Sequence, residues 1–264
     1  MNGKTPQIDS KIVDKSLRAI VWPVLKEVGF TRRNGRTTWR DRPGCIQTMN
    51  IQSFNSYLAE AMGATTFSFG VNVGVFYPVI AEHAGSGAFI KDLSRPAEYD
   101  CQARFHMAKG ISQPNTERRR WFGARTPVAE LGAWVDRPDV WYVRADGTNL
   151  DEVVADARDQ VVTTGLPWLD RLADLAEARR KFLEDESTNH APGIVAEHYG
   201  GALGSPARWH AIGALSVALG DPDGIEWATR EMASMRYYQD QPADLDALRR
   251  ASEPDKDWRV DSAR

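Results

Sequence analysis

Six polar side chains alternate with apolar neighbours along three segments of the chain and could together form a hydrogen-bonding surface. They are Asn50, Gln52, Asn72, Gln102, Arg104 and His106. In a strand, a period of two places all of them on one face of a sheet. Amides, a guanidinium and an imidazole suit hydrogen bonds to a peptide, a carboxylate or a phosphate. The pattern therefore predicts a binding surface; the alternative is a solvated face, or one covered by the chain's own loops.

Two glycines, Gly70 and Gly74, share this face in the segment from Thr65 to Tyr77. Every odd position from Phe67 to Tyr77 is apolar, which makes this the clearest strand in the sequence. Without side chains at two even positions, another backbone, an aromatic ring or a ligand can approach closely.

Catalysis is the alternative interpretation of the same face. His106 and Arg104 are two residues apart, about 7 Å along a strand, so they could serve as general base and anion stabiliser of a small hydrolase or transferase. The alternation places Cys101 on the apolar face, where burial would keep its thiol poorly ionised. Cys45 begins a strand after a turn, and nothing near it in sequence predicts a lowered pKa. We therefore assign no catalytic residue.

The histidines do not indicate a metal site. They are His83, His106, His190, His198 and His210, and none of them has the spacing of a zinc motif. The segment Gly85-Ser86-Gly87 lacks the Lys-Ser/Thr of a phosphate-binding loop and is predicted to be a flexible loop. We predict neither a metal nor a cofactor.

Arginines interleaved with tryptophan raise the alternative of nucleic-acid binding. They are Arg32, Arg33, Arg36, Arg40 and Arg42 around Trp39, and Arg118-Arg119-Arg120-Trp121. The whole chain has a net charge of -3, which is unusual for a nucleic-acid-binding domain. Residues 1–125 hold 18 Lys/Arg against 10 Asp/Glu, and residues 126–264 hold 15 against 26. We expect the arginines to pair with the acidic second half.

The periodicity predicts an α+β fold with a mostly antiparallel sheet of about five strands. An N-terminal helix is expected from Ser10 to Val28, broken near Trp22 by Pro23 and ended by Gly29. The predicted strands are residues 36–42, 45–53, 65–77, 99–107 and 140–144. One helix after the sheet is expected to begin at Asn149 and end at Gly165, and a second to begin at Pro167.

Changes in composition divide the chain into an α+β domain at 8–186, a helical extension at 190–251 and a flexible tail at 252–264. Within the extension, Ser205 caps a helix, Gly220 ends it and further helices follow. Two cysteines cannot form a disulfide framework, the N-terminus lacks the apolar core of a signal peptide, and no apolar run reaches the roughly 20 residues of a membrane span. A cytoplasmic location is the expectation.

Several short motifs occur in the order found in a bacterial family. They are Gly29-Phe30 followed by Arg32-Arg33, Asn50-Ile51-Gln52-Ser53, Asn72-Val73-Gly74, Cys101 and Arg104 as C-x-x-R, Trp141-Tyr142, and Leu166-Pro167-Trp168-Leu169. Over roughly residues 8–170 the chain resembles domain of unknown function number 4304. The resemblance implies an α+β domain with an N-terminal helix and antiparallel strands, and it implies no activity.

These observations favour a non-enzymatic, cytoplasmic binding protein that uses the polar sheet face, with a protein as its partner. Some uncharacterised families of this kind are immunity proteins encoded beside bacterial toxins, so an immunity role is one version of this hypothesis. The sequence predicts no oligomeric state.

Overall fold

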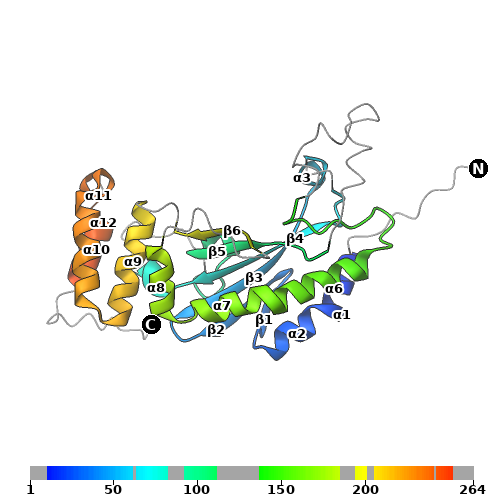
Figure 1. Ribbon diagram of the computed structural model, residues 1–264, viewed down its shortest axis with the longest axis horizontal. Coiled ribbons are helices and arrows are strands. Elements are labelled where there is room, and N and C mark those ends of the chain that lie inside the picture. The colour runs from blue at the N-terminus through cyan, green and yellow to red at the C-terminus, as the bar shows by residue number, and fades with distance from the viewer. Residues whose placement is uncertain are drawn as a thin grey trace, which may run out of the picture.

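A six-stranded antiparallel sheet, in which each strand pairs with the next one in the chain, forms the centre of the protein (Figure 1). The computed structural model describes residues 11–61, 64–82, 92–111, 137–184, 194–200, 205–240 and 242–251. The strands are β1 (Arg32–Asn34), β2 (Thr37–Arg42), β3 (Cys45–Ser53), β4 (Phe69–Phe76), β5 (Ala103–Met107) and β6 (Ile194–Tyr199). The predicted α+β class with an antiparallel sheet is confirmed.

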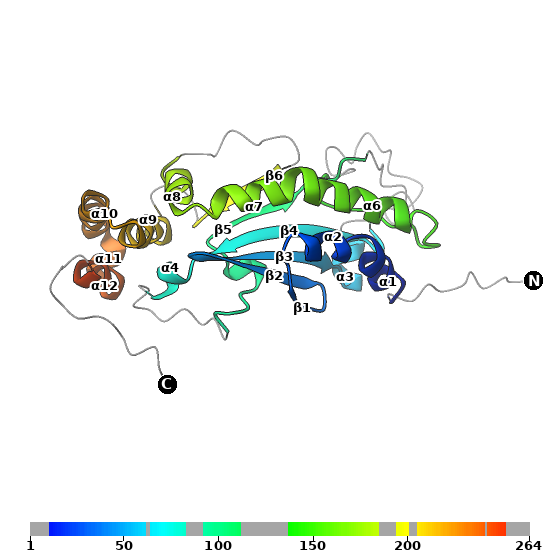
Figure 2. The same ribbon diagram turned by 90° about the horizontal axis from the view of Figure 1, so that it is seen from below.

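Helices cover one face of the sheet (Figure 2). They are α1 (Lys11–Ile20), α2 (Trp22–Glu27), α6 (Leu150–Gln160) and α7 (Leu166–Leu172), with the π-helical turn η3 (Val161–Gly165) between the last two. Val71, Val73 and Val75 of β4 are buried in the core that these helices share with the sheet. The odd positions of β4 therefore face the helices, as the alternation predicts.

The long helix does not stop at Gly165, contrary to the sequence prediction. The N–H of Leu166 bonds to the carbonyl of Val161, five residues back, and α7 continues from this π turn. Pro167 lies in the first turn of α7, directly after the hydrogen-bond register changes, so its missing N–H does not break the helix. A Cβ on Gly165 would lie 3.2 Å from Met107 Sδ, so glycine allows the turn to pack closely on β5.

The N-terminal helix breaks where the sequence predicts. Its two parts, α1 and α2, are separated at Val21, with Pro23 in the first turn of α2. Gly29 follows with a φ of 96°. A left-handed residue of this kind is what glycine supplies at a helix end.

The strands differ from prediction at several places: β1 was not predicted, and β4 is shorter than the predicted segment 65–77. β5 begins only at Ala103, because residues 98–100 form the 3-10 turn η1 (Glu98–Asp100), in which Asp100 accepts the N–H of Ala97. The predicted strand at 140–144 is reduced to one bridge between Trp141 and Phe69. Residues 194–199, placed by the sequence in the helical extension, form β6, because their backbone pairs with β5.

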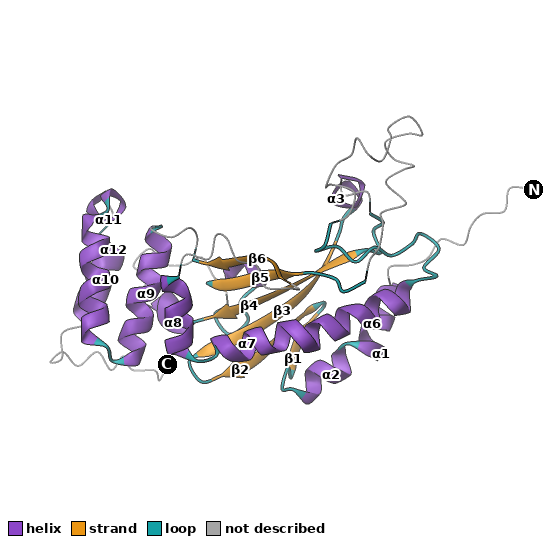
Figure 3. Cartoon of the chain, viewed as in Figure 1, coloured by secondary structure: helices purple, strands orange, loops and turns teal. Residues whose placement is uncertain are grey.

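The remaining helices lie mainly at the end of the sheet far from α1 (Figure 3). They are α4 (Pro78–Glu82), α8 (Leu175–Leu183), α9 (Pro206–Leu219), α10 (Pro222–Ser234), α11 (Arg236–Asp240) and α12 (Ala243–Ala251), while α3 (Ser56–Ala61) lies at the opposite end. Ser205 caps α9 and Gly220 ends it in a left-handed conformation, as predicted. Apolar residues of α9, α10 and α12 belong to the same core as the sheet. No helix in the described part of the chain could cross a membrane.

Arg40 of β2 links the sheet to α7 through a buried guanidinium. Its side chain is 4% exposed and forms an ion pair of 2.5 Å with Asp170. It also donates to Gln47 Oε1 and to the carbonyl of Val28. Burial lowers the pKa of Arg40, mainly through loss of hydration, and Asp170 opposes that effect.

Removing this guanidinium should destabilise the fold far more than removing its exposed neighbour. Arg40→Ala leaves the buried Gln47 Oε1 and the part-buried carbonyl of Val28 without this donor, so we expect the free energy of unfolding to fall by about 2–4 kcal/mol. Arg42, 40% exposed, pairs with the same carboxylate at 3.2 Å. Arg42→Ala is the matched control and should cost less than about 1 kcal/mol. Urea denaturation of both variants measures the difference, and equal losses would contradict the role given to Arg40.

Candidate functional site

The sheet register brings five of the six predicted side chains together on the face opposite the long helix. Asn72 of β4 lies opposite Asn50 of β3 on one side and His106 of β5 on the other. Two residues from Asn72 in either direction along β4 are Gly70, which lies opposite Gln52 of β3, and Gly74, which lies opposite Arg104 of β5. The structure thus places Asn72 and Arg104 on a common face, as the alternation predicts; their role in binding stays a prediction.

Gln102, the sixth predicted residue, has a structural partner instead. Its Oε1 accepts the N–H of Tyr77, just beyond the end of β4, at 2.8 Å. Its backbone carbonyl also accepts the N–H of Gly200 after β6. Gln102, just before β5, therefore forms hydrogen bonds with the residues next to the ends of β4 and β6.

A chain of hydrogen bonds joins Gln52, Asn72 and His106 across three strands, and we call it the polar row. Asn72 Nδ2 donates to Gln52 Oε1 at 2.9 Å, and Asn72 Oδ1 lies 2.7 Å from His106 Nδ1. Because this oxygen can only accept, Nδ1 of His106 carries the proton and Nε2 is the acceptor. Asn72 is 4% exposed, so the middle of the row is buried, whereas Gln52 at one end is exposed.

A second histidine, His198 of β6, extends the polar face and was not among the predicted site residues. It pairs with Arg104 across the sheet, and its ring meets that of His106 edge to face, with centroids 6.0 Å apart. Only the alternation within residues 194–199 could have indicated it, and the sequence analysis assigned those residues to helices. Pairing with a distant strand settled their conformation.

Burial lowers the pKa of His106, and the charges around it modify this effect. Asp139 raises the pKa, while Arg104 and Arg137 lower it. The pKa of His198 is also lowered, first by burial and then by Arg104 and His106. Both imidazoles are therefore neutral near pH 7.

Two loops of the chain itself occupy the space that the β4 glycines leave. A Cβ on Gly74 would lie 2.6 Å from Cys101 Cβ, and one on Gly70 would lie 3.3 Å from the carbonyl oxygen of Asp139. Another part of the chain approaches closely at both glycines, so at these two positions the face is covered by the chain's own loops, which was the alternative to a binding surface. Asn72 lies between the two covered positions.

The placement of Cys101 on the helix-facing side was wrong. Because β5 begins at Ala103, the alternation does not extend back to Cys101, and its side chain packs on Gly74 at the polar face. Burial raises the pKa of this thiol well above its usual range, and that of Cys45 to about 12. Neither sulfur is an activated nucleophile.

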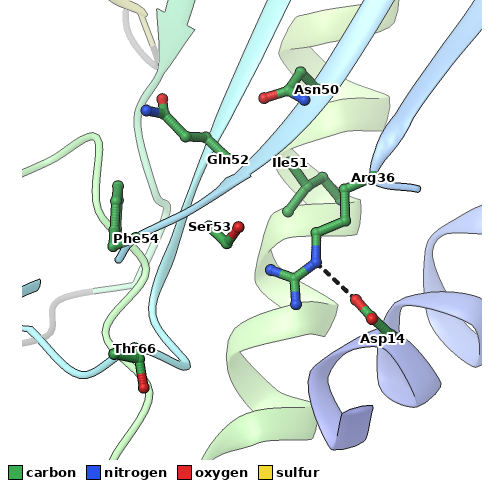
Figure 4. A pocket seen from close by; sticks show the side chains of 8 residues that line it. All are labelled: Asp14, Arg36, Asn50, Ile51, Gln52, Ser53, Phe54 and Thr66. Atoms are coloured by element: carbon green, nitrogen blue, oxygen red, sulfur yellow. Dashed lines mark hydrogen bonds and ion pairs between the residues drawn. The ribbon is translucent and has the colours of Figure 1, made fainter. Parts of the chain in front are cut away.

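A pocket of about 740 Å³ opens at the end of β3, next to the polar row (Figure 4). Its lining residues are Asp14, Arg36, Asn50, Ile51, Gln52, Ser53, Phe54 and Thr66. Arg36 Nε bonds to Asp14 Oδ1 at 2.7 Å, while its Nη1 is buried without a hydrogen-bond partner among the described residues. β2 begins opposite Asn50, and the N–H of Ile51 bonds to the carbonyl of Arg36, so the edge of β3 beyond Ile51 borders the pocket without a paired strand.

The arginines considered for nucleic-acid binding have partners within the chain. Arg32 pairs with Asp41, Arg36 with Asp14, and both Arg40 and Arg42 with Asp170. Arg33 lies over the ring of Trp22, and the buried Trp39 donates to the carbonyl of Pro96. Asp170 lies in the acidic second half, whereas Asp14 and Asp41 do not, so the expected pairing between halves holds for two of the arginines.

Several residues named from the sequence, Arg118-Arg119-Arg120-Trp121, Gly85-Ser86-Gly87, His83 and His190, lie outside the described residues. Within the described residues, no group of three or more His, Cys, Asp or Glu side chains could hold a metal ion.

Comparison with known proteins yields one family. The model of a family described as Domain of unknown function (DUF4304) matches residues 21–171, more than half of the chain. No curated protein and no solved structure matches the chain.

The contact at Gly74 predicts a graded effect of added methyl groups. Gly74→Ala forces a Cβ against Cys101 and should lower the free energy of unfolding by about 1–3 kcal/mol, as overpacking does. Gly70→Ala meets its neighbour at a longer distance and should cost less. Thermal or urea unfolding of the two variants tests this order, and a more damaging Gly70→Ala would refute it.

The lowered pKa of His106 predicts how stability depends on pH. In the unfolded chain its pKa is near 6.5, and in the folded protein it is lower. The unfolded state therefore binds more protons as the pH falls through 6.5, so the free energy of unfolding should decrease. His106→Gln, whose amide can still donate to Asn72, should make this decrease shallower. Urea titrations between pH 8 and about 5 measure both slopes, and identical slopes would contradict the assignment.

Proposed function

The chain belongs to the DUF4304 family, a domain of unknown function, and we propose that it is a non-enzymatic protein-binding module whose polar sheet face holds an extended segment of a partner protein. The observation that carries this proposal is the polar row. Asn72 fixes two side chains whose outer groups are a donor, Gln52 Nε2, and an acceptor, His106 Nε2. A peptide backbone offers the complementary carbonyl and N–H groups.

The row is organised before any ligand binds. Because Asn72 is buried and bonded on both sides, Gln52 and His106 lose little further freedom when they contact a ligand. The two outer strands of the row, β3 and β5, are about 10 Å apart, which corresponds to three residues of an extended chain. A peptide segment can therefore meet both ends of the row at once.

The pocket at the end of β3 supports the same proposal. Gln52 belongs to both the polar row and the pocket lining, so the two features adjoin. Ser53 lies beyond the start of β2, so its backbone edge is available to an added strand. An extended partner segment could then run from the pocket onto the sheet face.

A small hydrolase or transferase is the second candidate, and the state of His106 favours it. Its Nε2 is unprotonated and its ring is oriented by Asn72, as a general base requires. The thiol on this face, Cys101, is not ionised, so the attacking group would have to be water or a second substrate. Covalent change in a captured ligand would support this candidate over simple binding.

One version of the proposal is that the chain is a bacterial immunity protein, which binds a toxin in the cytoplasm and neutralises it. The polar face is compatible with such a partner. A toxin gene next to the gene of this chain would support this version, and co-purification of the two products would test it directly.

Affinity capture with paired variants tests the binding module. Gln52→Ala/Arg104→Ala removes two side chains of the polar face, and Arg230→Ala/Arg236→Ala removes two exposed charges from α10 and α11. We expect a partner recovered by the wild-type protein to bind the first variant at least about tenfold more weakly, since two lost hydrogen bonds together amount to 1.4 kcal/mol or more. The second variant should bind as the wild type does. Equal recovery by all three proteins would contradict the proposal.

A further inference from the structure

We propose that Arg104, His106 and His198 form a binding site for an oxyanion, a carboxylate or phosphate group, on the polar face of β5 and β6. The inference goes beyond the proposed function, because it assigns a specific ligand group to an overlapping set of side chains, in which His106 is shared with the polar row, and it applies to free anions as well as to a protein.

The three side chains converge through the sheet register. Arg104 and His106 are two residues apart on β5, so they point to the same face. His198 of β6 lies directly opposite Arg104, and its ring contacts the ring of His106. Three nitrogen-bearing groups from two strands therefore surround one patch of the face.

Arg104 has unused hydrogen-bonding capacity at this patch. Its one hydrogen bond in the described structure runs from Nη1 to the carbonyl of Tyr99 at 3.5 Å, longer than a normal bond. Among the described carboxylates, none forms an ion pair with it. A planar guanidinium that keeps most of its N–H groups is the preferred partner for a two-oxygen anion.

Besides Arg104, three charged groups act at or near the patch, namely Arg137, Asp139 and Glu98. Asp139 is already held by Arg137, which donates to both of its carboxylate oxygens. Glu98, on η1, is a carboxyl on which the charge of Arg104 acts: burial raises the pKa of Glu98, and Arg104 opposes that effect. The field of Arg104 is the largest electrostatic effect at His198, whereas at His106 the opposing effect of Asp139 comes first and that of Arg104 second.

This field also predicts how binding depends on pH. Arg104 contributes to the low pKa of both His106 and His198, so a bound anion should offset it and raise both values. Protonation of His106 occurs on Nε2, which then becomes a donor to the anion. Anion binding should therefore be tighter below the pKa of these imidazoles than above it.

Imidazole NMR of the full chain tests the site with inorganic phosphate and, separately, acetate as probes. We expect saturable shifts of the His106 and His198 resonances and a rise in both pKa values. If phosphate saturates the shifts at a lower concentration than acetate does, the site prefers phosphate groups. If acetate saturates them at the lower concentration, the site prefers carboxylates. Arg104→Gln should weaken binding about tenfold or more, because a charged hydrogen-bond donor is lost. Arg230→Ala, which removes an exposed charge elsewhere, should leave it unchanged.

Two results would overturn the inference. One is that anions shift the imidazole resonances of Arg104→Gln and of the wild-type protein equally; the other is that they shift all histidines by the same amount, as a change in ionic strength alone would. A comparison of anion binding by the wild-type protein and by Arg104→Lys separates charge attraction from the proposed geometry, because lysine keeps the charge but lacks the planar guanidinium. Undiminished binding by Arg104→Lys would contradict the guanidinium contact. Intact anion shifts without partner capture would contradict only the proposed function. Partner capture without anion shifts would contradict only this site.

Discussion

The close packing of two loops against glycines of β4 is the constraint on which the polar face depends. β4 is buried along its whole length, by the helices at its odd positions and by the chain's own loops at Gly70 and Gly74. Between these two glycines, Asn72 is the residue of β4 that has a side chain on this face. Its amide is buried, and a buried amide must satisfy its hydrogen bonds. Its partners, Gln52 and His106, are therefore fixed in place by the same packing that stabilises the sheet.

Electrostatic interactions divide the basic residues into two groups with different roles. The arginines of β1 and β2 are paired with carboxylates or stacked on an aromatic ring, and Arg40 joins the sheet to α7 from a buried position. These contacts stabilise the fold and leave little charge for a ligand. Arg104, by contrast, is half-buried on the polar face of β5 and makes one long hydrogen bond within the described structure. Whether an arginine is available to bind a ligand thus depends more on whether its guanidinium is already paired than on the net charge of the segment.

Much of the fold could be predicted from local patterns, and the errors have identifiable causes. β3 was predicted at its observed bounds from a weak strand signal, because turn and loop residues bound the segment on both sides. The error at Cys101 arose because apolar alternation continues into the preceding 3-10 turn, where it no longer reports the face of a sheet. β6 was missed because a short apolar segment does not distinguish strand from helix until a neighbouring strand supplies hydrogen-bond partners. The helix continues through Gly165 because a π turn shifts the hydrogen-bond register just before Pro167, which the sequence pattern does not indicate.

The sequence by itself determined the α+β class, the shared face of Asn72 and Arg104 and the close approach at both glycines, since side-chain alternation and the absence of a Cβ are local properties. The tertiary structure decided what fills the space above Gly70 and Gly74, which nitrogen of His106 faces outward, and that His198 lies beside Arg104. These features depend on contacts between residues 25 or more positions apart, such as the 34 that separate Asn72 from His106. The free energy of such contacts is defined only once the strands are in register, so no local pattern in the chain could reveal them.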